Sequence, residues 1–209
     1  MTATNPNIDT AMVRHQPVAV VGQRQAFQAS GPETVQFLQG QLSQDVAAMA
    51  PGDAGFTLLL HPQGKIAAWM RVARVSDDTY IFDVDAGYRT AAIERLERFK
   101  LRTDCMITPL DWQSITVIGP GARDVAVTGV EHDVDDRLGD LEARVIFGAA
   151  PEVSDVEFVD AALIDALRIE AGRPAMGSEL DDSTIPAAAG IVEVSVSFTK
   201  GCYLSLIHI

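Results

Sequence analysis

The sequence predicts an α+β fold built from antiparallel, ferredoxin-like units. The chain has 209 residues, of which 47% are hydrophobic, so it can bury a sizeable core. Short apolar runs bounded by Gly, Pro and Asp predict strands, and apolar residues recurring every three or four positions predict helices between them. The predicted order in the first half is β-α-β-β-α-β, with a looser repeat of that order later, which is typical of this class.

The chain starts with polar, irregular residues 1–16, which we expect to be flexible. Two apolar runs follow and predict strands at Val18–Val21 and Ala26–Ala29. The first helix is then expected over Pro32–Gln39, because the preceding Ser and the Glu three positions later have the spacing of a capping box. Gly40 is expected to bend or end this helix.

A β-hairpin is predicted next. Its strands are Gly55–Leu60 and Lys65–Val75, and the intervening His-Pro-Gln-Gly suits a tight turn. Tyr80–Val84 predicts a further strand. Tyr88–Phe99 has apolar residues at helical spacing, so an amphipathic helix closes this half.

The rest of the chain alternates short strands, turns and helices. A Gly and a Pro end the last predicted helix, which has inward-facing leucines. The predicted elements are strands at Cys105–Ile107, Ser114–Ile118 and Ala143–Phe147, a weak helix at Ala122–Val127, an acidic loop at Glu131–Asp140, and a helix at Asp160–Ala171.

The net charge of −13 comes from 16 basic and 29 acidic residues. Such a surface repels phosphate backbones and anionic lipid, so we expect no direct binding to nucleic acid or membranes. The densest basic stretch, Arg89–Arg102, is interleaved with glutamates and is interpreted as a solvated helix face. The start has no signal-peptide pattern, and no apolar run reaches the roughly 18 residues of a membrane span, which favours a cytoplasmic protein.

The segment FTKGCY contains the candidate thiol, Cys202, two residues after Lys200. An ammonium near a thiol lowers the pKa of the thiol, and Gly201 allows a partner to approach the backbone. The alternative is a buried, unreactive cysteine, which the residues alone favour and which we also expect for Cys105. Two distant cysteines and four scattered histidines predict neither a disulfide nor a metal site.

Two further residues could bind a ligand. Glu170, in RIEAG near a helix end, could accept hydrogen bonds from the paired ring N–H groups of a heterocycle, or it could be an ordinary surface carboxylate. Lys65, in the hairpin turn PQGK, could neutralise an anionic ligand tail, although most turn lysines are merely solvated. Without a wider context the surface interpretation is preferred for both.

Several segments taken together resemble the YgfZ family of folate-binding proteins, relatives of the glycine-cleavage T-protein aminomethyltransferase. They are FLQGQLSQDV from Phe37, PQGKI, RFKLR, RIEAGRPAMGSEL and FTKGCY, in the same order as in the family. The resemblance implies an aminomethyltransferase-like folate-binding fold over residues 17–203.

The resemblance also implies residue roles. Glu170 would contact the pterin of tetrahydrofolate or a one-carbon derivative, and Lys65 could meet its glutamyl tail. Cys202 would be a redox-active or cluster-contacting thiol, in a site shaped by Lys200, Gly201 and Tyr203. Relatives support iron–sulfur cluster assembly or repair and, indirectly, tRNA modification, so iron–sulfur proteins or assembly factors are the implied partners.

Two departures from the family pattern narrow these expectations. Ala68 and Trp69 stand where the aminomethyltransferases carry an Asp pair, and neither can accept a proton, which disfavours classical aminomethyl transfer. After Tyr203 the family motif breaks off, so we expect residues 204–209 to be a truncated or non-native tail and the C-terminal barrel domain to be absent.

Two alternatives stay open. The chain could be a folate-dependent one-carbon transferase of the T-protein type that uses another acid, Asp83 or Asp85. It could also be a fragment that folds poorly because an apolar tail replaces the start of a partner domain.

Overall fold

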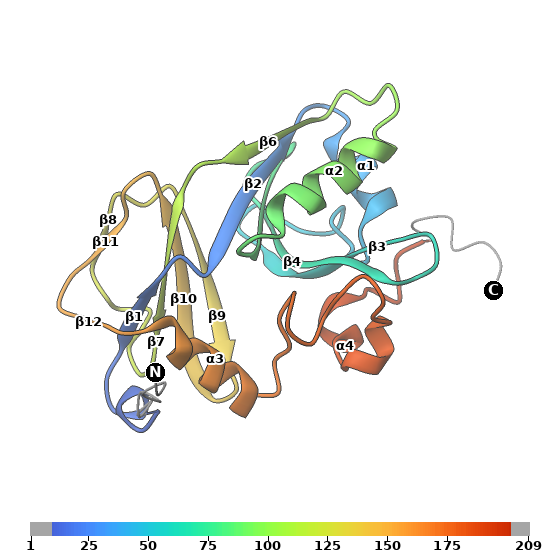
Figure 1. Cartoon of the computed structure of the whole chain (residues 1–209). Coiled ribbons are helices and arrows are strands. Elements are labelled where there is room, and N and C mark those ends of the chain that lie inside the picture. The colour runs from blue at the N-terminus through green and yellow to red at the C-terminus, as the bar shows by residue number, and fades with distance from the viewer. Residues whose placement is uncertain (1–9, 202–209) are drawn as a thin grey trace, which may run out of the picture. The chain divides into compact units, whose positions relative to one another are not determined.

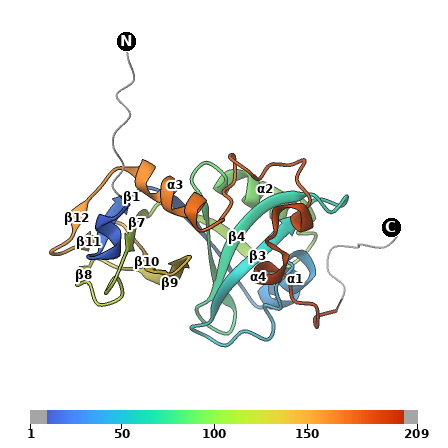
Figure 2. The same cartoon turned by 90° about the horizontal axis from the view of Figure 1, so that it is seen from below.

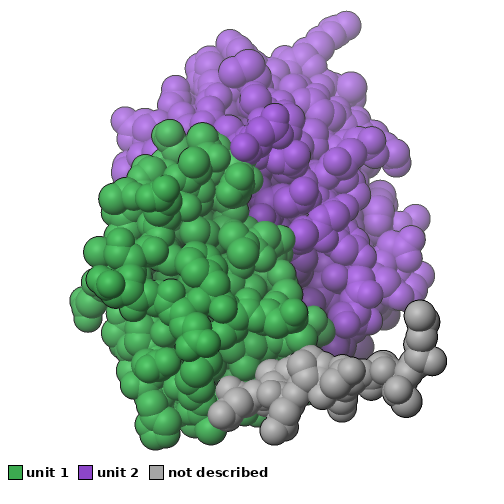
Figure 3. Space-filling model, turned by 60° about the vertical axis from the view of Figure 1, so that its left-hand side comes forward, with its two compact units in different colours: residues 1–23, 112–173 green, residues 24–111, 174–209 purple. Residues whose placement is uncertain are grey.

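The computed structural model describes residues 10–201, and the chain divides into two compact units. Unit 1 consists of residues 1–23 and 112–173, and unit 2 of residues 24–111 and 174–209 (Figure 3). Each unit contains a five-stranded sheet (Figure 1). The α+β class expected from the sequence is confirmed.

The sheet of unit 2 is antiparallel throughout. Its strands, in spatial order, are β3 (Ala54–Leu60), β4 (Ile66–Arg74), β5 (Thr79–Asp85), β2 (Arg24–Ser30) and β6 (Met106–Leu110). The helices are α1 (Thr34–Gln41) and α2 (Arg89–Phe99). The order along the chain is β-α-β-β-β-α-β. Its three middle strands correspond to the predicted hairpin and the predicted strand at Tyr80–Val84, one strand more than in the predicted order β-α-β-β-α-β.

One face of this sheet packs against both helices. Leu38 of α1 and Leu96 of α2 lie in one buried cluster with Phe27 and Phe82, whose rings stack with centroids 4.7 Å apart. Successive residues of a strand point to opposite faces, so Trp69, Arg71 and Asp83 lie on the other face.

The other face is partly covered by the C-terminal part of unit 2. Trp69 packs in a second cluster with Met176, Leu180 and Ile191, which follow one another along this segment. The segment contains a 3-10 helix, Pro186–Ala189, and α4 (Val192–Ser195), which lies beside β3 (Figure 2). The β3–β4 hairpin therefore lies between two layers of unit 2. Helices α1 and α2 cover one face, and the segment that precedes FTKG covers the other.

The sheet of unit 1 is mixed, because β1 pairs in parallel with β12 and every other pairing is antiparallel. Its strands, in spatial order, are β12 (Glu157–Phe158), β1 (Val18–Val21), β7 (Gln113–Ile118), β10 (Leu141–Gly148) and β9 (His132–Leu138). A separate two-stranded ladder joins β8 (Val127–Thr128) and β11 (Glu152–Val153).

The helix of unit 1, α3 (Ala161–Glu170), packs on this sheet. Its N-cap residue, Asp160, accepts a hydrogen bond from the amide of Ala162 at 2.8 Å. Leu163 and Leu167 lie in a buried cluster with Val13, which belongs to the 3-10 helix Met12–Arg14. Residues 12–14 therefore form a 3-10 helix that packs on the core of unit 1, although we expected residues 1–16 to be flexible. In the part of the chain that the structure describes, no helix is long and apolar enough to cross a membrane.

Several local predictions were wrong. The expected acidic loop contains β9, an edge strand whose Val134 and Leu138 point inward. Asp136 lies on the same face and pairs with Arg173, whereas Asp133 and Asp135 point outward. The weak helix at Ala122–Val127 is instead a turn leading into β8. The stretch Arg89–Arg102 is not simply a solvated face, because the side chain of Arg95 is buried.

The first helix also departs from its prediction. It begins at Thr34, and Gly40 lies inside it. Glu33 is the N-cap residue, and no side-chain hydrogen bond caps the helix. The expected capping box does not form, because the carboxylate of Glu33 accepts a hydrogen bond from the amide of Asp104 at 2.6 Å.

Candidate functional site

Glu170 is the last residue of α3, in unit 1, and its side chain is 48% exposed. One carboxylate oxygen accepts a hydrogen bond from the hydroxyl of Thr10 at 3.3 Å, and the other accepts from the guanidinium of Arg14 at 3.4 Å. Both contacts are long, and Arg14 is shared with Asp140. The carboxylate is therefore accessible to a ligand that displaces two weak contacts.

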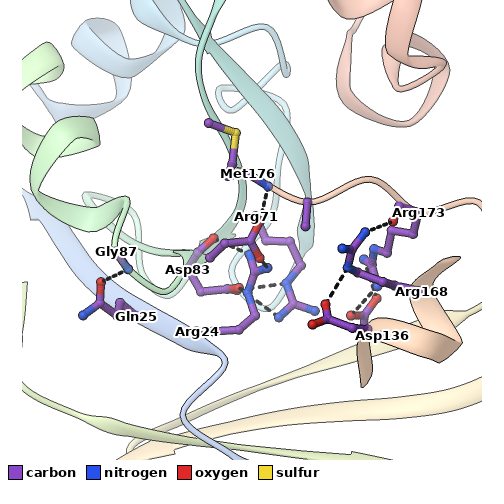
Figure 4. A network of polar contacts seen from close by, with 12 residues as sticks. Arg24, Gln25, Arg71, Asp83, Gly87, Asp136, Arg168, Arg173 and Met176 are labelled. Carbon is purple, nitrogen blue, oxygen red and sulfur yellow. Dashed lines mark hydrogen bonds and ion pairs between the residues drawn. The ribbon is translucent and has the colours of Figure 1, made fainter. Parts of the chain in front are cut away.

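The turn after Glu170 is held by a stronger pair. Arg173 donates two hydrogen bonds to Asp136 of β9, at 2.9 and 3.0 Å, and its amide donates to the carbonyl of Arg168 (Figure 4). A two-pronged guanidinium–carboxylate pair fixes direction as well as distance. This pair fixes the RIEAGR segment on the sheet of unit 1, so the position of Glu170 is set by the fold.

Lys65 lies in the turn between β3 and β4, in unit 2, and its side chain is exposed. Its carbonyl accepts a hydrogen bond from the amide of His61 at 2.8 Å, which closes the turn. The predicted hairpin is confirmed. The fold holds the backbone of Lys65 and leaves its ammonium in contact with solvent.

Lys200 has a different environment. Its ammonium donates to the carbonyls of Gln39, Leu42 and Gln44, at 2.8, 2.7 and 2.9 Å. The carbonyl of Gln39 belongs to the last turn of α1, where helix carbonyls lack partners within the helix, and those of Leu42 and Gln44 follow directly after the helix. Burial lowers the pKa of Lys200 to about 8, while the negative charge of Asp45 acts in the opposite direction. Lys200 therefore connects FTKG to the FLQGQLSQD segment.

The remaining residues of the predicted thiol site are only partly described. Gly201 is exposed, whereas Cys202 and Tyr203 lie outside the described residues, as does the predicted tail 204–209. Cys105 is buried, as predicted, and burial raises the pKa of its thiol. Among residues 10–201, no group of three His, Cys, Asp or Glu side chains could hold a metal ion.

The two positions of the family's Asp pair are part of the packed interior of unit 2. Ala68 is buried on the helix-covered face. Trp69 is buried on the opposite face, stacks on Phe56 with centroids 4.7 Å apart, and donates its indole N–H to the hydroxyl oxygen of Ser195 at 2.8 Å. Trp69 thus attaches α4 to the hairpin.

A buried ion network lies on the same face of that sheet (Figure 4). Asp83 accepts two hydrogen bonds from Arg71, each 2.9 Å long, and a further bond from Arg24. Arg24 also donates to one oxygen of Asp85 at 2.6 Å, and the other oxygen accepts from the amide of Met176 at 2.9 Å. These contacts join three strands of the sheet to the segment after α3.

The electrostatics of this network decide what Asp83 can do. Burial raises the pKa of Asp83, but the charges of Arg24 and Arg71 outweigh burial and lower this pKa to about 2. Such a carboxylate stays ionised at neutral pH and is a poor proton acceptor. The geometry therefore argues against Asp83 as the acid of the alternative transferase, and Asp85 already uses both of its oxygens.

Arg71, Ser43 and Ser195 hold this region together and were not predicted from the sequence. Arg71 interrupts the apolar strand around it, and Asp83 interrupts another, so a charge within each of two apolar strands was a readable signal for a buried pair. Ser195 and Ser43 had no such signal. The hydroxyl of Ser43 donates to the carbonyl of Ser195 at 2.5 Å, a contact between residues far apart in the chain.

Comparison with known proteins gives one family and several relatives. Residues 11–144 match the family model described as the GCVT N-terminal domain. An uncharacterized protein of Haemophilus influenzae is 27% identical over 188 residues, which cover 87% of this chain and 63% of that protein. The tRNA-modifying protein YgfZ of Pectobacterium carotovorum is 26% identical over 198 residues, covering 83% of this chain and 59% of that protein.

Two more matches broaden this set. The mitochondrial iron-sulfur cluster assembly factor IBA57 homolog of Mycosarcoma maydis is 24% identical over 208 residues, covering 90% of this chain and 51% of that protein. The crystal structure of glycine cleavage system aminomethyltransferase T from Bartonella henselae has a TM-score of 0.73 at 19% identity and covers 88% of this chain and 60% of that one, which shows the shared fold. The chain spans between about half and two thirds of the length of the proteins it matches.

Proposed function

Since the chain belongs to the GCVT N-terminal domain family, we propose that it binds tetrahydrofolate or a one-carbon derivative of it, and supports iron–sulfur cluster assembly or repair. Folate binding is typical of this family. The link to iron–sulfur clusters is supported by the similarity to an IBA57 homolog, and an indirect link to tRNA modification by the similarity to YgfZ. These relatives are only 24–26% identical to this chain, so the links to iron–sulfur clusters and to tRNA modification belong to the proposal.

One observation favours a binding factor over an aminomethyltransferase. The positions of the family's Asp pair are occupied by buried Ala68 and Trp69, and the indole N–H of Trp69 is bound to Ser195. A side chain that packs in the core and anchors α4 offers neither a proton acceptor nor a charge for a reacting methylene group.

Glu170 is the proposed contact for the pterin. Its carboxylate has two acceptor oxygens, is half exposed, and makes only the two long contacts with Thr10 and Arg14. A pair of ring N–H groups could replace these two donors one for one. The residues present therefore suit the group that the family implies. When bound, the folate would supply a carrier for a one-carbon unit.

Cys202 is proposed as the thiol that contacts a cluster or a redox partner. The contacts of Lys200 support this role. Its ammonium binds three carbonyls and so holds the residues just before Cys202 against the end of α1. Iron–sulfur proteins or their assembly factors are the proposed partners. Complementation with Cys202→Ser tests this role, and full activity of the dependent cluster enzymes would contradict it.

Titration calorimetry with tetrahydrofolate tests the ligand assignment. Wild-type protein should bind, Glu170→Ala should bind at least about tenfold more weakly, and Glu131→Ala should match wild type, since Glu131 is an exposed glutamate of the same unit. Arg14→Gln should bind slightly more tightly, because it removes a competing donor. Absence of folate binding, or binding that Glu170→Ala leaves unchanged, would overturn the assignment.

A transferase assay separates the proposal from its alternative. Under the proposal, the protein forms no 5,10-methylene-tetrahydrofolate from an aminomethyl donor. Turnover that is lost in Asp85→Asn would instead establish the one-carbon transferase.

A further inference from the structure

We propose that Arg95, covered by the ring of Phe99, is a binding site in unit 2 for a carboxylate of the kind carried by the γ-glutamyl tail of folates. The choice of tail rests on the proposed folate function. The site itself rests on the surroundings of one buried guanidinium in α2 and on its place beside the hairpin turn.

Arg95 is only 5% exposed, yet it uses little of its hydrogen-bonding capacity. Its Nη2 donates to the carbonyl of Leu60 at 2.7 Å. Its Nε and Nη1 are buried and have no hydrogen-bond partner among residues 10–201. Buried polar groups in folded proteins almost always have a partner, so two unused donors on one side chain need an explanation.

The charge of Arg95 is also uncompensated within the described residues, where no carboxylate lies within ion-pair distance of it. Burial lowers the pKa of Arg95, and the neighbouring positive charge of Arg98 lowers it further. A buried arginine is normally paired with an acid, because an unpaired charge in the interior is strongly destabilising. An anionic ligand would supply the missing partner.

Arg95 lies beside the hairpin turn of unit 2. Leu60, whose carbonyl it binds, is the last residue of β3, and the turn to Lys65 begins at the next residue. Two cations therefore lie at the same end of the hairpin. The guanidinium of Arg95 is buried and fork-shaped, and the ammonium of Lys65 is exposed. A fork of N–H groups binds one carboxylate specifically, while an ammonium in solvent attracts anions over a longer range.

Phe99 controls access to the guanidinium. The centroid of its ring lies 3.8 Å from the Cζ atom of Arg95, which is a cation–π contact. Phe99 is 39% exposed and is the last residue of α2, where a side chain can turn outward without disrupting a helical turn. The ring therefore packs over the guanidinium, and its removal should make Arg95 more accessible to a carboxylate.

The test compares monoglutamyl and triglutamyl tetrahydrofolate by calorimetry, with the dipeptide γ-glutamylglutamate as a probe that has no pterin. Wild-type protein should bind the dipeptide and should prefer the triglutamyl form. Arg95→Lys keeps the charge but loses the fork, and should reduce both effects about tenfold. Phe99→Ala keeps Arg95 and opens the site, so it should strengthen both. Arg98→Lys, the same substitution at an exposed position of α2, should stay within about twofold of wild type.

The outcomes separate this inference from the proposed function. Dipeptide binding that depends on Arg95, without binding of either folate, would support the carboxylate site and refute the folate proposal. Equal binding of both folates, with no dipeptide binding, would overturn the carboxylate site and leave the folate proposal standing. Equal effects of Arg95→Lys and Arg98→Lys would also overturn the site, since ordered water then suffices as the partner of Arg95.

Discussion

Trp69 donates its indole N–H to the hydroxyl oxygen of Ser195 at 2.8 Å, and this bond joins β4 to α4 within unit 2. We expect Trp69→Phe to lower the free energy of unfolding by about 1–3 kcal/mol, because it removes a buried hydrogen bond and leaves a small void. Chemical denaturation measures the loss. In a double-mutant cycle with Ser195→Ala, the two losses should be non-additive, and simple additivity would mean that the bond contributes nothing.

Asp83 should make the protein sensitive to acid. Its pKa is about 2 in the folded state and about 3.9 when exposed, so its stabilising effect is complete above the unfolded value and is lost as the pH falls through the folded one. Asp83→Asn should cost roughly 3–5 kcal/mol at neutral pH, because it leaves buried guanidiniums without their acid.

The stability difference between wild type and Asp83→Asn should shrink between about pH 4 and pH 2. Denaturation curves at a series of pH values measure this difference. Asp77→Asn is the control, since the side chain of Asp77 is 99% exposed. A pH-independent difference would show that folding does not shift the pKa of Asp83.

Lys200→Met should destabilise the C-terminal part of unit 2. The variant leaves three carbonyls without their ammonium partner, which we expect to cost roughly 1–3 kcal/mol. Limited proteolysis should then cut residues 196–201 faster than in wild type. Lys65→Met is the control, because the side chain of Lys65 is exposed, and equal proteolysis of both variants would refute the anchoring role.

Gly177→Ala should be more damaging than Gly190→Ala. Both glycines have positive φ, +82° and +69°, so both substitutions strain the backbone. A Cβ at Gly177 would also lie 2.5 Å from the hydroxyl oxygen of Tyr88, whereas one at Gly190 would meet nothing within 4 Å. The difference between the two unfolding free energies isolates this clash, and Tyr88→Phe should relieve part of it. Equal losses would mean that the loop moves freely away from Tyr88.

The sequence predicted elements whose signals are local. The hairpin was found because a Pro and a Gly stand between two apolar runs, and α3 because leucines repeat at helical spacing before a Gly and a Pro. Strand β9 was missed because five of its seven residues are polar or charged. Its inward face carries Val134 and Leu138 with Asp136 between them, paired with Arg173, and an edge strand can leave the side chains of its other face in water.

Part of the candidate site could be predicted, because a charged residue at the end of a helix or in a turn is usually exposed. Glu170 lies at a helix end, as its neighbouring Gly indicated. The carbonyl partners of Lys200 could not be predicted, because they lie in a segment about 160 residues earlier in the chain. The same holds for Arg95, whose burial depends on Leu60 in the hairpin and not on the pattern of its own helix.

The parallel pairing of β1 with β12 has a consequence for biosynthesis. All five strands of the unit 2 sheet lie within residues 24–111, whereas β1 leaves the ribosome long before its partners β7 and β12. We therefore expect the nascent chain to form the unit 2 sheet while Val18 and Val20 are still unpaired. During that interval β1 is an apolar strand without a sheet, and chaperones that hold extended apolar segments should bind the nascent chain there.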